Sequence, residues 1–258
     1  GIMFKKISLF LVCTVFVFCE SNYVDTLGKC KIDDSACGKD LLQSVIRDIS
    51  KNGVQELEIP PIDPFELKNI SISILDFVDI TMIEGTVKGA KDCIVNRFET
   101  DIESGRVFLE MTCDLSIKGR YKVYSNSPLI KSFTGGETLN GEGNGKVKIE
   151  KLNLKLDFGF FIQRRNGELY IQSKTDKINY TFDIKKMQFF ADQLYIGKQE
   201  SSKLVTGLLN ENWRALMDSF GKPFMDKAME HVLVFLHKFF ETVPVKHYIS
   251  SDLTKYYI

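Results

Sequence analysis

Two long stretches of this chain place apolar residues at every second position. The first stretch is Val107–Ile117, in which polar residues such as Glu110 and Asp114 alternate with the apolar ones. The second is Leu152–Ile162. Successive side chains of a strand point to opposite faces of a sheet, so these stretches predict long strands with one buried and one solvent-facing side.

The residues around the second stretch predict a bulge, a hairpin turn and a loop. The alternation slips between Val147–Ile149 and Leu152, which predicts a β-bulge near Glu150. Asn166-Gly167 suits the positive φ angles of a tight hairpin. Glycines at positions 135, 136, 141, 143 and 145 predict a turn-rich, poorly packed loop before the strand.

Apolar residues at helical spacing replace this alternation near both ends of the chain. Asp40, with Gln43 three positions later, resembles a capping box, and Gly53 suits a helix C-terminus, so a helix is predicted between them. A second helix is predicted from Glu211 to Glu241, buried along most of its length, because the apolar residues from Trp213 to Phe239 fall on one broad face.

The second predicted helix constrains the fold class. It would be about 45 Å long at 1.5 Å per residue, with a kink at Pro223. A helix of this length needs a long apolar surface to lie against, and one-faced antiparallel strands supply that surface if their sheet curls. The sequence therefore predicts an α+β fold in which a strongly curved sheet packs along a long C-terminal helix.

The first 20 residues have the composition of a signal peptide. Gly1 and Ile2 precede Met3 as a leader remnant, Lys5 and Lys6 are basic, and Ile7–Phe18 is apolar but too short to span a bilayer. Cleavage after Cys19, or a residue or two later, is predicted, and residues 21–258 are interpreted as a single domain in an extracellular location. An N-terminal membrane anchor is the alternative, and no later stretch is apolar enough to form an integral membrane span.

Charge and cysteine content narrow the partners and the compartment. The 34 basic and 34 acidic residues balance, which argues against nucleic acid, whose binders carry a basic patch. Signal cleavage would remove Cys13 and Cys19, and the remaining even set predicts two disulfides with three possible connectivities. Cys30 and Cys37 are close in the sequence, which favours a disulfide between them and leaves Cys93–Cys113 as the second. A zinc site is the alternative, but the spacing of the cysteines disfavours it.

The sequence offers no recognisable catalytic or metal site, and it predicts no cofactor. His231, His237 and His247 are interpreted as surface or helix-edge residues, since no metalloprotease or nucleophile-elbow motif accompanies them. Asn69 and Asn179 begin glycosylation sequons, and either could be used in a secreted chain.

Short motifs at both ends and in the middle of the chain resemble the insect takeout and haemolymph juvenile hormone-binding family, in matching order across nearly the whole mature chain. No cysteine follows Cys113, so a second disulfide in the later half cannot form, and the takeout branch fits better. The motifs are Cys30-(x6)-Cys37, Ile59-Pro60-Pro61-Ile62-Asp63-Pro64, Gly89-Ala90-Lys91-Asp92-Cys93, Gly119-Arg120-Tyr121, Gly141-Glu142-Gly143, Gly167-Glu168-Leu169-Tyr170, Leu194-Tyr195-Ile196-Gly197 and Leu209-Asn210-Glu211-Asn212-Trp213.

This resemblance implies a tubular lipid-binding fold of the super-roll type, with an elongated apolar tunnel between sheet and helix. It implies a secreted carrier of a hydrophobic small molecule, such as an isoprenoid or a fatty-acyl compound. Tyr121 could offer its hydroxyl to the ligand or be an ordinary buried tyrosine, and the apolar candidates could equally be packed core. The tunnel candidates are Leu109, Met111, Tyr121, Leu154, Leu156, Phe158, Phe160, Trp213, Leu216, Phe220, Phe224 and Phe235.

Two other functions remain open at this point. A signalling protein could have the same fold, act through an unknown receptor and hold a structural lipid in its tunnel. A lipid esterase would need a nucleophile beside a base, and the sequence offers no such arrangement.

Overall fold

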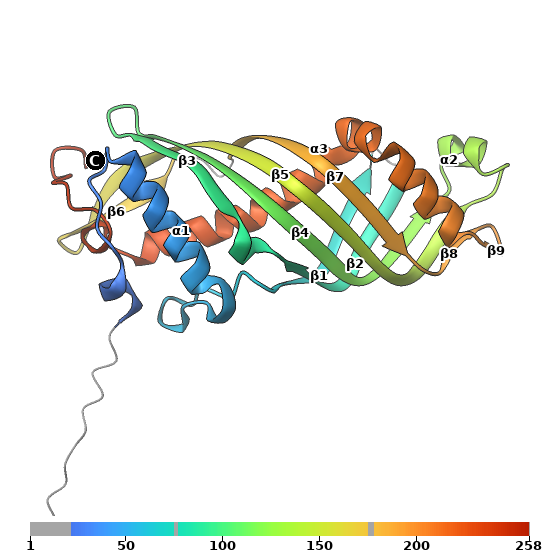
Figure 1. Ribbon diagram of the computed structural model, residues 1–258, viewed down its shortest axis with the longest axis horizontal. Coiled ribbons are helices and arrows are strands. Elements are labelled where there is room, and N and C mark those ends of the chain that lie inside the picture. Colours follow the sequence, from blue (N-terminus) through green and yellow to red (C-terminus); the bar gives the residue numbers. More distant parts are fainter. Residues whose placement is uncertain (1–21, 75–76, 175–177, 258) are drawn as a thin grey trace, which may run out of the picture.

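The computed structural model describes residues 22–74, 77–174 and 178–257 (Figure 1), so the predicted signal peptide lies outside the described residues. Within these ranges one open antiparallel sheet is built from nine strands. The strands are β1 (Phe65–Ile74), β2 (Val78–Lys88), β3 (Ile94–Asp101), β4 (Arg106–Ser125), β5 (Leu139–Arg165), β6 (Glu168–Ser173), β7 (Asn179–Ala191), β8 (Leu194–Ile196) and β9 (Gln199–Glu200).

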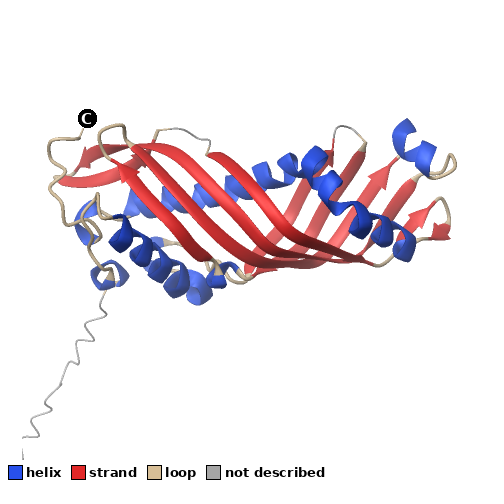
Figure 2. Ribbon diagram, turned by 45° about the horizontal axis from the view of Figure 1, so that its top comes forward, coloured by secondary structure: helices blue, strands red, loops and turns tan. Residues whose placement is uncertain are grey.

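The two longest strands, β4 and β5, form the centre of the sheet. They pair along their whole shared length, from Arg106 opposite Gly159 to Ser125 opposite Leu139. The other edge of β4 is shared by β2 and β3, and the other edge of β5 by β6, β7 and β8. The strands cross the molecule obliquely, so the sheet is strongly twisted (Figure 2). Both apolar stretches predicted as strands lie in β4 and β5.

The predicted bulge and hairpin are also confirmed. The register of β4 with β5 shifts between Cys113 and Leu115, opposite Glu150 and Lys151. Lys151 has a φ of 52°, and its backbone N–H and its ammonium group donate to the carboxylate of Asp114 at 2.7 and 2.8 Å. The β5–β6 hairpin turns at Asn166-Gly167, where both φ angles are positive.

The predicted glycine-rich loop is confirmed for Gly135 and Gly136, which lie in a turn. It is wrong for Gly141, Gly143 and Gly145, which lie inside β5. Each pairs with β4, so the ladder hydrogen bonds outweigh the low strand propensity of glycine. A Cβ atom at Gly141 would lie 2.6 Å from the carbonyl oxygen of Gln193, and one at Gly143 would lie 2.5 Å from that of Asp192. Glycine is needed here because another segment of backbone approaches closely.

The helices are α1 (Ser35–Asn52), α2 (Pro128–Phe133) and α3 (Ser202–Thr242), with 3₁₀ turns η1 (Tyr23–Thr26), η2 (Gln55–Leu57), η3 (Ala90–Asp92) and η4 (Val245–His247). The predicted start of the first helix at Asp40 is wrong. Asp34 is the N-cap and accepts a hydrogen bond from the backbone N–H of Cys37 at 3.0 Å. The predicted end is correct, since Gly53 caps α1 with a φ of 63°.

The start of the long helix was also wrongly predicted, because α3 begins at Ser202 rather than Glu211. Ser202 Oγ accepts a hydrogen bond from the backbone N–H of Leu194 at 2.9 Å, and Val205 packs against a small cluster centred on Tyr121 and Val123. These tertiary contacts stabilise turns that contain the weak helix formers Thr206 and Gly207. The predicted end is correct to one residue.

Burial along α3 is more limited than predicted. The fully buried residues of the helix are Gly221, Met225, Met229 and Phe239, and its other inward apolar side chains are half-buried. Pro223 lies inside the helix, and α3 is bent part-way along in both views (Figures 1 and 2). Proline removes one helical hydrogen bond and clashes with the preceding turn, which accounts for the bend. No helix in the described part of the chain is long and apolar enough to cross a membrane.

Candidate functional site

Helix α3 touches both outer strands of the five-strand path β1-β2-β4-β5-β7. On the β7 side, the Asn210 amide makes two hydrogen bonds to the backbone of Phe189, donating at 2.9 Å and accepting at 2.7 Å. On the β1 side, the rings of Phe65 and His231 lie 5.3 Å apart. The sheet and α3 therefore bound a common interior between them.

Further contacts fix the middle of α3 against β7. The hydroxyl of Tyr180 donates to the Asp226 carboxylate at 2.5 Å. Gly221 is buried, and a Cβ atom there would lie 3.2 Å from the ring of Phe182. The bond to the carboxylate and the burial of its hydroxyl both raise the pKa of Tyr180, with burial the larger cause. The α3–β7 contact thus combines polar bonds at its rim with close apolar packing.

One end of this interior is filled by side chains. Leu156, Phe160 and Ile162 of β5 are almost completely buried in the largest apolar cluster. A small cavity of about 10 Å³ lies between this end of the sheet and the last turns of α3. That space is lined by Phe158, Phe160, Ile171, Ser173, Leu233, Leu236, His237 and Phe240.

The other half of the interior is packed less completely. The inward apolar residues of β1 and β2 are half-buried, as with Ile70 and its partner Met82. Val78 and Ile80 of β2 pack against the small cluster around Tyr121 and Val123. Phe220 and Phe224 of α3 are half-buried as well. A row of glycines across β2, β4 and β5 carries no side chain into this half. The row is Gly85, Gly119 and Gly145, which are direct neighbours in register.

The structure divides the predicted tunnel residues between these two halves. The strand candidates are buried together in the main cluster, with Met111 packed against it. Trp213 packs with Met217 against a second cluster around Ile149 and Ile184. The remaining helix candidates are half-buried. That any of them lines a tunnel stays a prediction. The buried strand candidates are Leu109, Leu154, Leu156, Phe158 and Phe160, and the half-buried helix candidates are Leu216, Phe220, Phe224 and Phe235.

Tyr121 is a hydrogen-bonded, buried tyrosine. Its hydroxyl donates to the backbone carbonyl of Asp192 at 2.7 Å. Burial raises the pKa of Tyr121 to about 12, and the nearby charges of Asp192 and Glu200 add to the effect. Its one O–H donor is therefore already used inside the protein.

Sequence reasoning misjudged two residues of this interior, and it placed His231 at the surface or at a helix edge. His231 is a half-buried residue whose Nε2 atom is buried and has no hydrogen-bond partner among the described residues. Asn210 was noted only as part of a motif, although it joins α3 to β7. No periodicity marks either residue, because each acts across elements that are distant in sequence.

The cysteines form both predicted disulfides, and the two sequon asparagines are exposed. Cys30 is bonded to Cys37 at the start of α1, and Cys93 to Cys113 across η3 and β4. Asn69 on β1 and Asn179 at the start of β7 are exposed. Their glycosylation stays a prediction.

Known proteins with similar sequences or structures identify the family and the fold. A family model described as haemolymph juvenile hormone binding protein matches residues 8–250. The crystal structure of Takeout 1 from Epiphyas postvittana is similar with a TM-score of 0.75 and 23% identity, over 86% of this chain and 99% of that one. A crystal structure of lipopolysaccharide binding protein gives a TM-score of only 0.37 at 11% identity, over 79% of this chain and 37% of that one. No curated protein matches significantly.

Proposed function

This chain belongs to the haemolymph juvenile hormone binding protein family, and we propose that it is an extracellular carrier of an elongated apolar molecule. The ligand lies between the curved sheet and α3 and leaves chemically unchanged. The family match across residues 8–250 is the observation that carries the proposal. The signal-peptide composition, the two disulfides and the exposed sequons support an extracellular location.

The less packed half of the interior is the proposed ligand site. Its half-buried apolar side chains come from both walls, such as Ile70 and Met82 on the sheet and Phe220 on α3. A ligand of about 15 carbons would gain on the order of 12 kcal/mol at about 0.8 kcal/mol per methylene, before the cost of association. Affinity would come mainly from apolar burial, and selectivity from the length and shape of the space.

His231 is the proposed polar anchor for the ligand. A buried imidazole nitrogen without a partner costs free energy, because it has lost its hydrogen bond to water. A carbonyl or hydroxyl group on the ligand would restore that bond. The ring of Phe65 beside His231 would then contact the apolar chain next to the polar group.

The test uses delipidated protein and a series of saturated fatty acids and linear isoprenoid alcohols of increasing length. We expect binding that strengthens with chain length up to a limit, measured by displacement of a radiolabelled fatty acid. Phe220→Trp should lower that limit. Val234→Trp is the matched control, since Val234 lies on the same helix but is 68% exposed. His231→Phe should weaken the binding of alcohols and acids more than the binding of a hydrocarbon of equal length.

Two results would overturn the carrier function. Turnover of a labelled lipid ester would indicate an esterase. Failure of the delipidated, folded protein to bind any member of the series would favour a signalling protein that acts through a receptor.

A further inference from the structure

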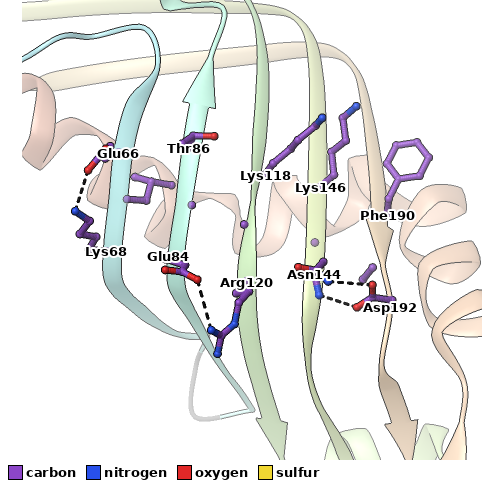
Figure 3. Close-up of a pocket in the computed structure, with 15 residues that line it drawn as sticks. Glu66, Lys68, Glu84, Thr86, Lys118, Arg120, Asn144, Lys146, Phe190 and Asp192 are labelled. Carbon is purple, nitrogen blue, oxygen red and sulfur yellow. Dashed lines mark hydrogen bonds and ion pairs between the residues drawn. The ribbon is translucent and has the colours of Figure 1, made fainter.

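A groove of about 880 Å³ crosses β1, β2, β4, β5 and β7 on the face of the sheet away from α3. Figure 3 shows the labelled side chains on the near face of the strands, with α3 behind them. The floor of the groove contains the glycine row Gly85, Gly119 and Gly145. The glycine row alternates with the wall residues along each strand, so its positions face the interior and only their backbone borders the groove. The outward side chains of the two flanking rows form the walls.

The strand register defines both walls. Neighbours along the first wall are Glu66, Thr86, Lys118, Lys146 and Phe190, and those along the second are Lys68, Glu84, Arg120 and Asn144. Asp192 completes the second wall, because its carboxylate accepts a hydrogen bond of 2.6 Å from the backbone N–H of Asn144.

The second wall largely neutralises its own charge. Arg120 lies 3.5 Å from the Glu84 carboxylate and 3.4 Å from that of Glu142. Asp192 accepts hydrogen bonds from Asn144. These pairs leave little charge for a partner to recognise on this side.

The first wall carries uncompensated positive charge at its centre. Lys118 and Lys146 are directly opposite each other on β4 and β5, an arrangement of like charges that destabilises a sheet. Lys148 follows on β5, and no carboxylate lies within ion-pair distance of these three lysines in the described part of the chain. Desolvation and the neighbouring Lys148 and Lys118 lower the pKa of Lys146. At the end of this wall Phe190 is 49% exposed.

The dimensions of the groove restrict its occupant. Five strands spaced about 4.8 Å apart span about 19 Å, and two rows that are two residues apart are separated by about 7 Å. An α-helix is about 10–12 Å wide and is too broad for such a groove. A flat bilayer surface would not reach the floor between the two walls. An extended peptide of about six residues, at about 3.3 Å per residue, has the matching length and width.

We propose that this groove binds an extended acidic peptide segment of a partner protein. Its carboxylates pair with Lys118 and Lys146, and an apolar side chain contacts Phe190. The peptide lies across the strands, so its recognition depends on side chains rather than on addition of a strand to the sheet edge. The proposal does not depend on the ligand carried between the sheet and α3.

Fluorescence anisotropy of labelled hexapeptides tests this proposal. The peptides contain one leucine and zero, two or four Asp or Glu residues, and a lysine-containing peptide serves as the charge control. We expect binding to increase with the number of acidic residues and to weaken with added salt, because exposed ion pairs are screened. Lys118→Gln/Lys146→Gln should weaken binding of the most acidic peptide about tenfold.

The matched control is Lys122→Gln/Lys155→Gln, which removes the same charge from exposed positions of β4 and β5 outside the groove. Binding should change less than about twofold in this variant. Equal weakening by both double variants would show attraction to net charge alone and would overturn the proposal. Absence of acidic-peptide binding would also overturn it, including a result in which only a sulfated hexasaccharide or phosphatidylserine vesicles bind. Retention of fatty-acid binding by the variants would separate this outcome from failure of the carrier function.

Discussion

Replacement of Asn210 by alanine tests the contact between α3 and the edge of the sheet. The Asn210 amide donates to the Phe189 carbonyl at 2.9 Å and accepts from the Phe189 backbone N–H at 2.7 Å. Phe189 lies on β7, which pairs with β5 on one side only. The amide thus occupies the place that the backbone of another strand would take on this edge.

The expected loss of stability follows from these two bonds. Each hydrogen bond contributes about 0.5–1.5 kcal/mol net, so removing both should cost about 1–3 kcal/mol. Alanine regains about 0.6 kcal/mol of helix propensity, and water can reach the exposed Asn210 position. We therefore expect Asn210→Ala to lower the free energy of unfolding by about 1–2 kcal/mol.

Urea unfolding measures this change, with Asn212→Ala as the matched control. Asn212 has the same helix propensity, but its side chain bonds only to the Leu208 carbonyl one turn earlier in α3. The control should change stability by less than about 0.5 kcal/mol. Asn210→Asp should be at least as unstable as Asn210→Ala, because a carboxylate accepts from the Phe189 N–H but repels the Phe189 carbonyl oxygen.

Hydrogen exchange locates the effect. The amides at the edge of β7 should exchange faster in Asn210→Ala, and fatty acid should dissociate faster if opening of this contact releases ligand. Equal stability of Asn210→Ala and Asn212→Ala, with unchanged exchange in β7, would refute the structural role assigned to Asn210.

Two further predictions concern packing and pH. Phe160→Ala should lower the free energy of unfolding by about 3–5 kcal/mol and Phe220→Ala by only about 1–2 kcal/mol, because Phe160 is fully buried and Phe220 is half-buried. Equal losses in thermal or urea unfolding would contradict the division of the interior into a filled and a less packed half. Tyr121→Phe should cost about 1 kcal/mol at neutral pH through the lost bond to Asp192. Folding raises the pKa of Tyr121 from 10.0 to about 12. The contribution of Tyr121 to the stability of the fold is therefore complete below pH 10 and is lost as the pH rises towards 12. The stability difference between wild type and Tyr121→Phe should therefore narrow over that range in urea unfolding, and a constant difference would contradict the assignment.

Several elements were predictable from the sequence because they depend on near neighbours in the chain. Alternation in Val107–Ile117 and Leu152–Ile162 identified β4 and β5, since a strand repeats every two residues. A slip in that alternation located the bulge at Glu150, and Asn166-Gly167 located the β5–β6 turn. The order of the short motifs pointed to the family that the comparison over residues 8–250 shows.

Other features depended on tertiary contacts. The early start of α3 at Ser202 depends on Leu194 and on packing of Val205, and the extension of β5 through its glycines depends on pairing with β4. Gly207 weakens the first turns of α3, and the glycines of β5 weaken that strand, but contacts with distant segments override both effects.

Periodicity identifies the apolar side of a strand or helix but does not give the separation between two apolar sides. Phe160 and Phe220 both fit an apolar pattern. Phe160, however, is packed in the filled end of the interior, whereas Phe220 is half-buried in the less packed half. Similarly, Lys118 and Lys146 are separated by 27 intervening residues in the sequence, and only the register of β4 with β5 makes them neighbours. The sequence by itself determined which faces of β4, β5 and α3 are apolar. The tertiary structure decided which of them meet, because that depends on strand register and on how the sheet curves around α3.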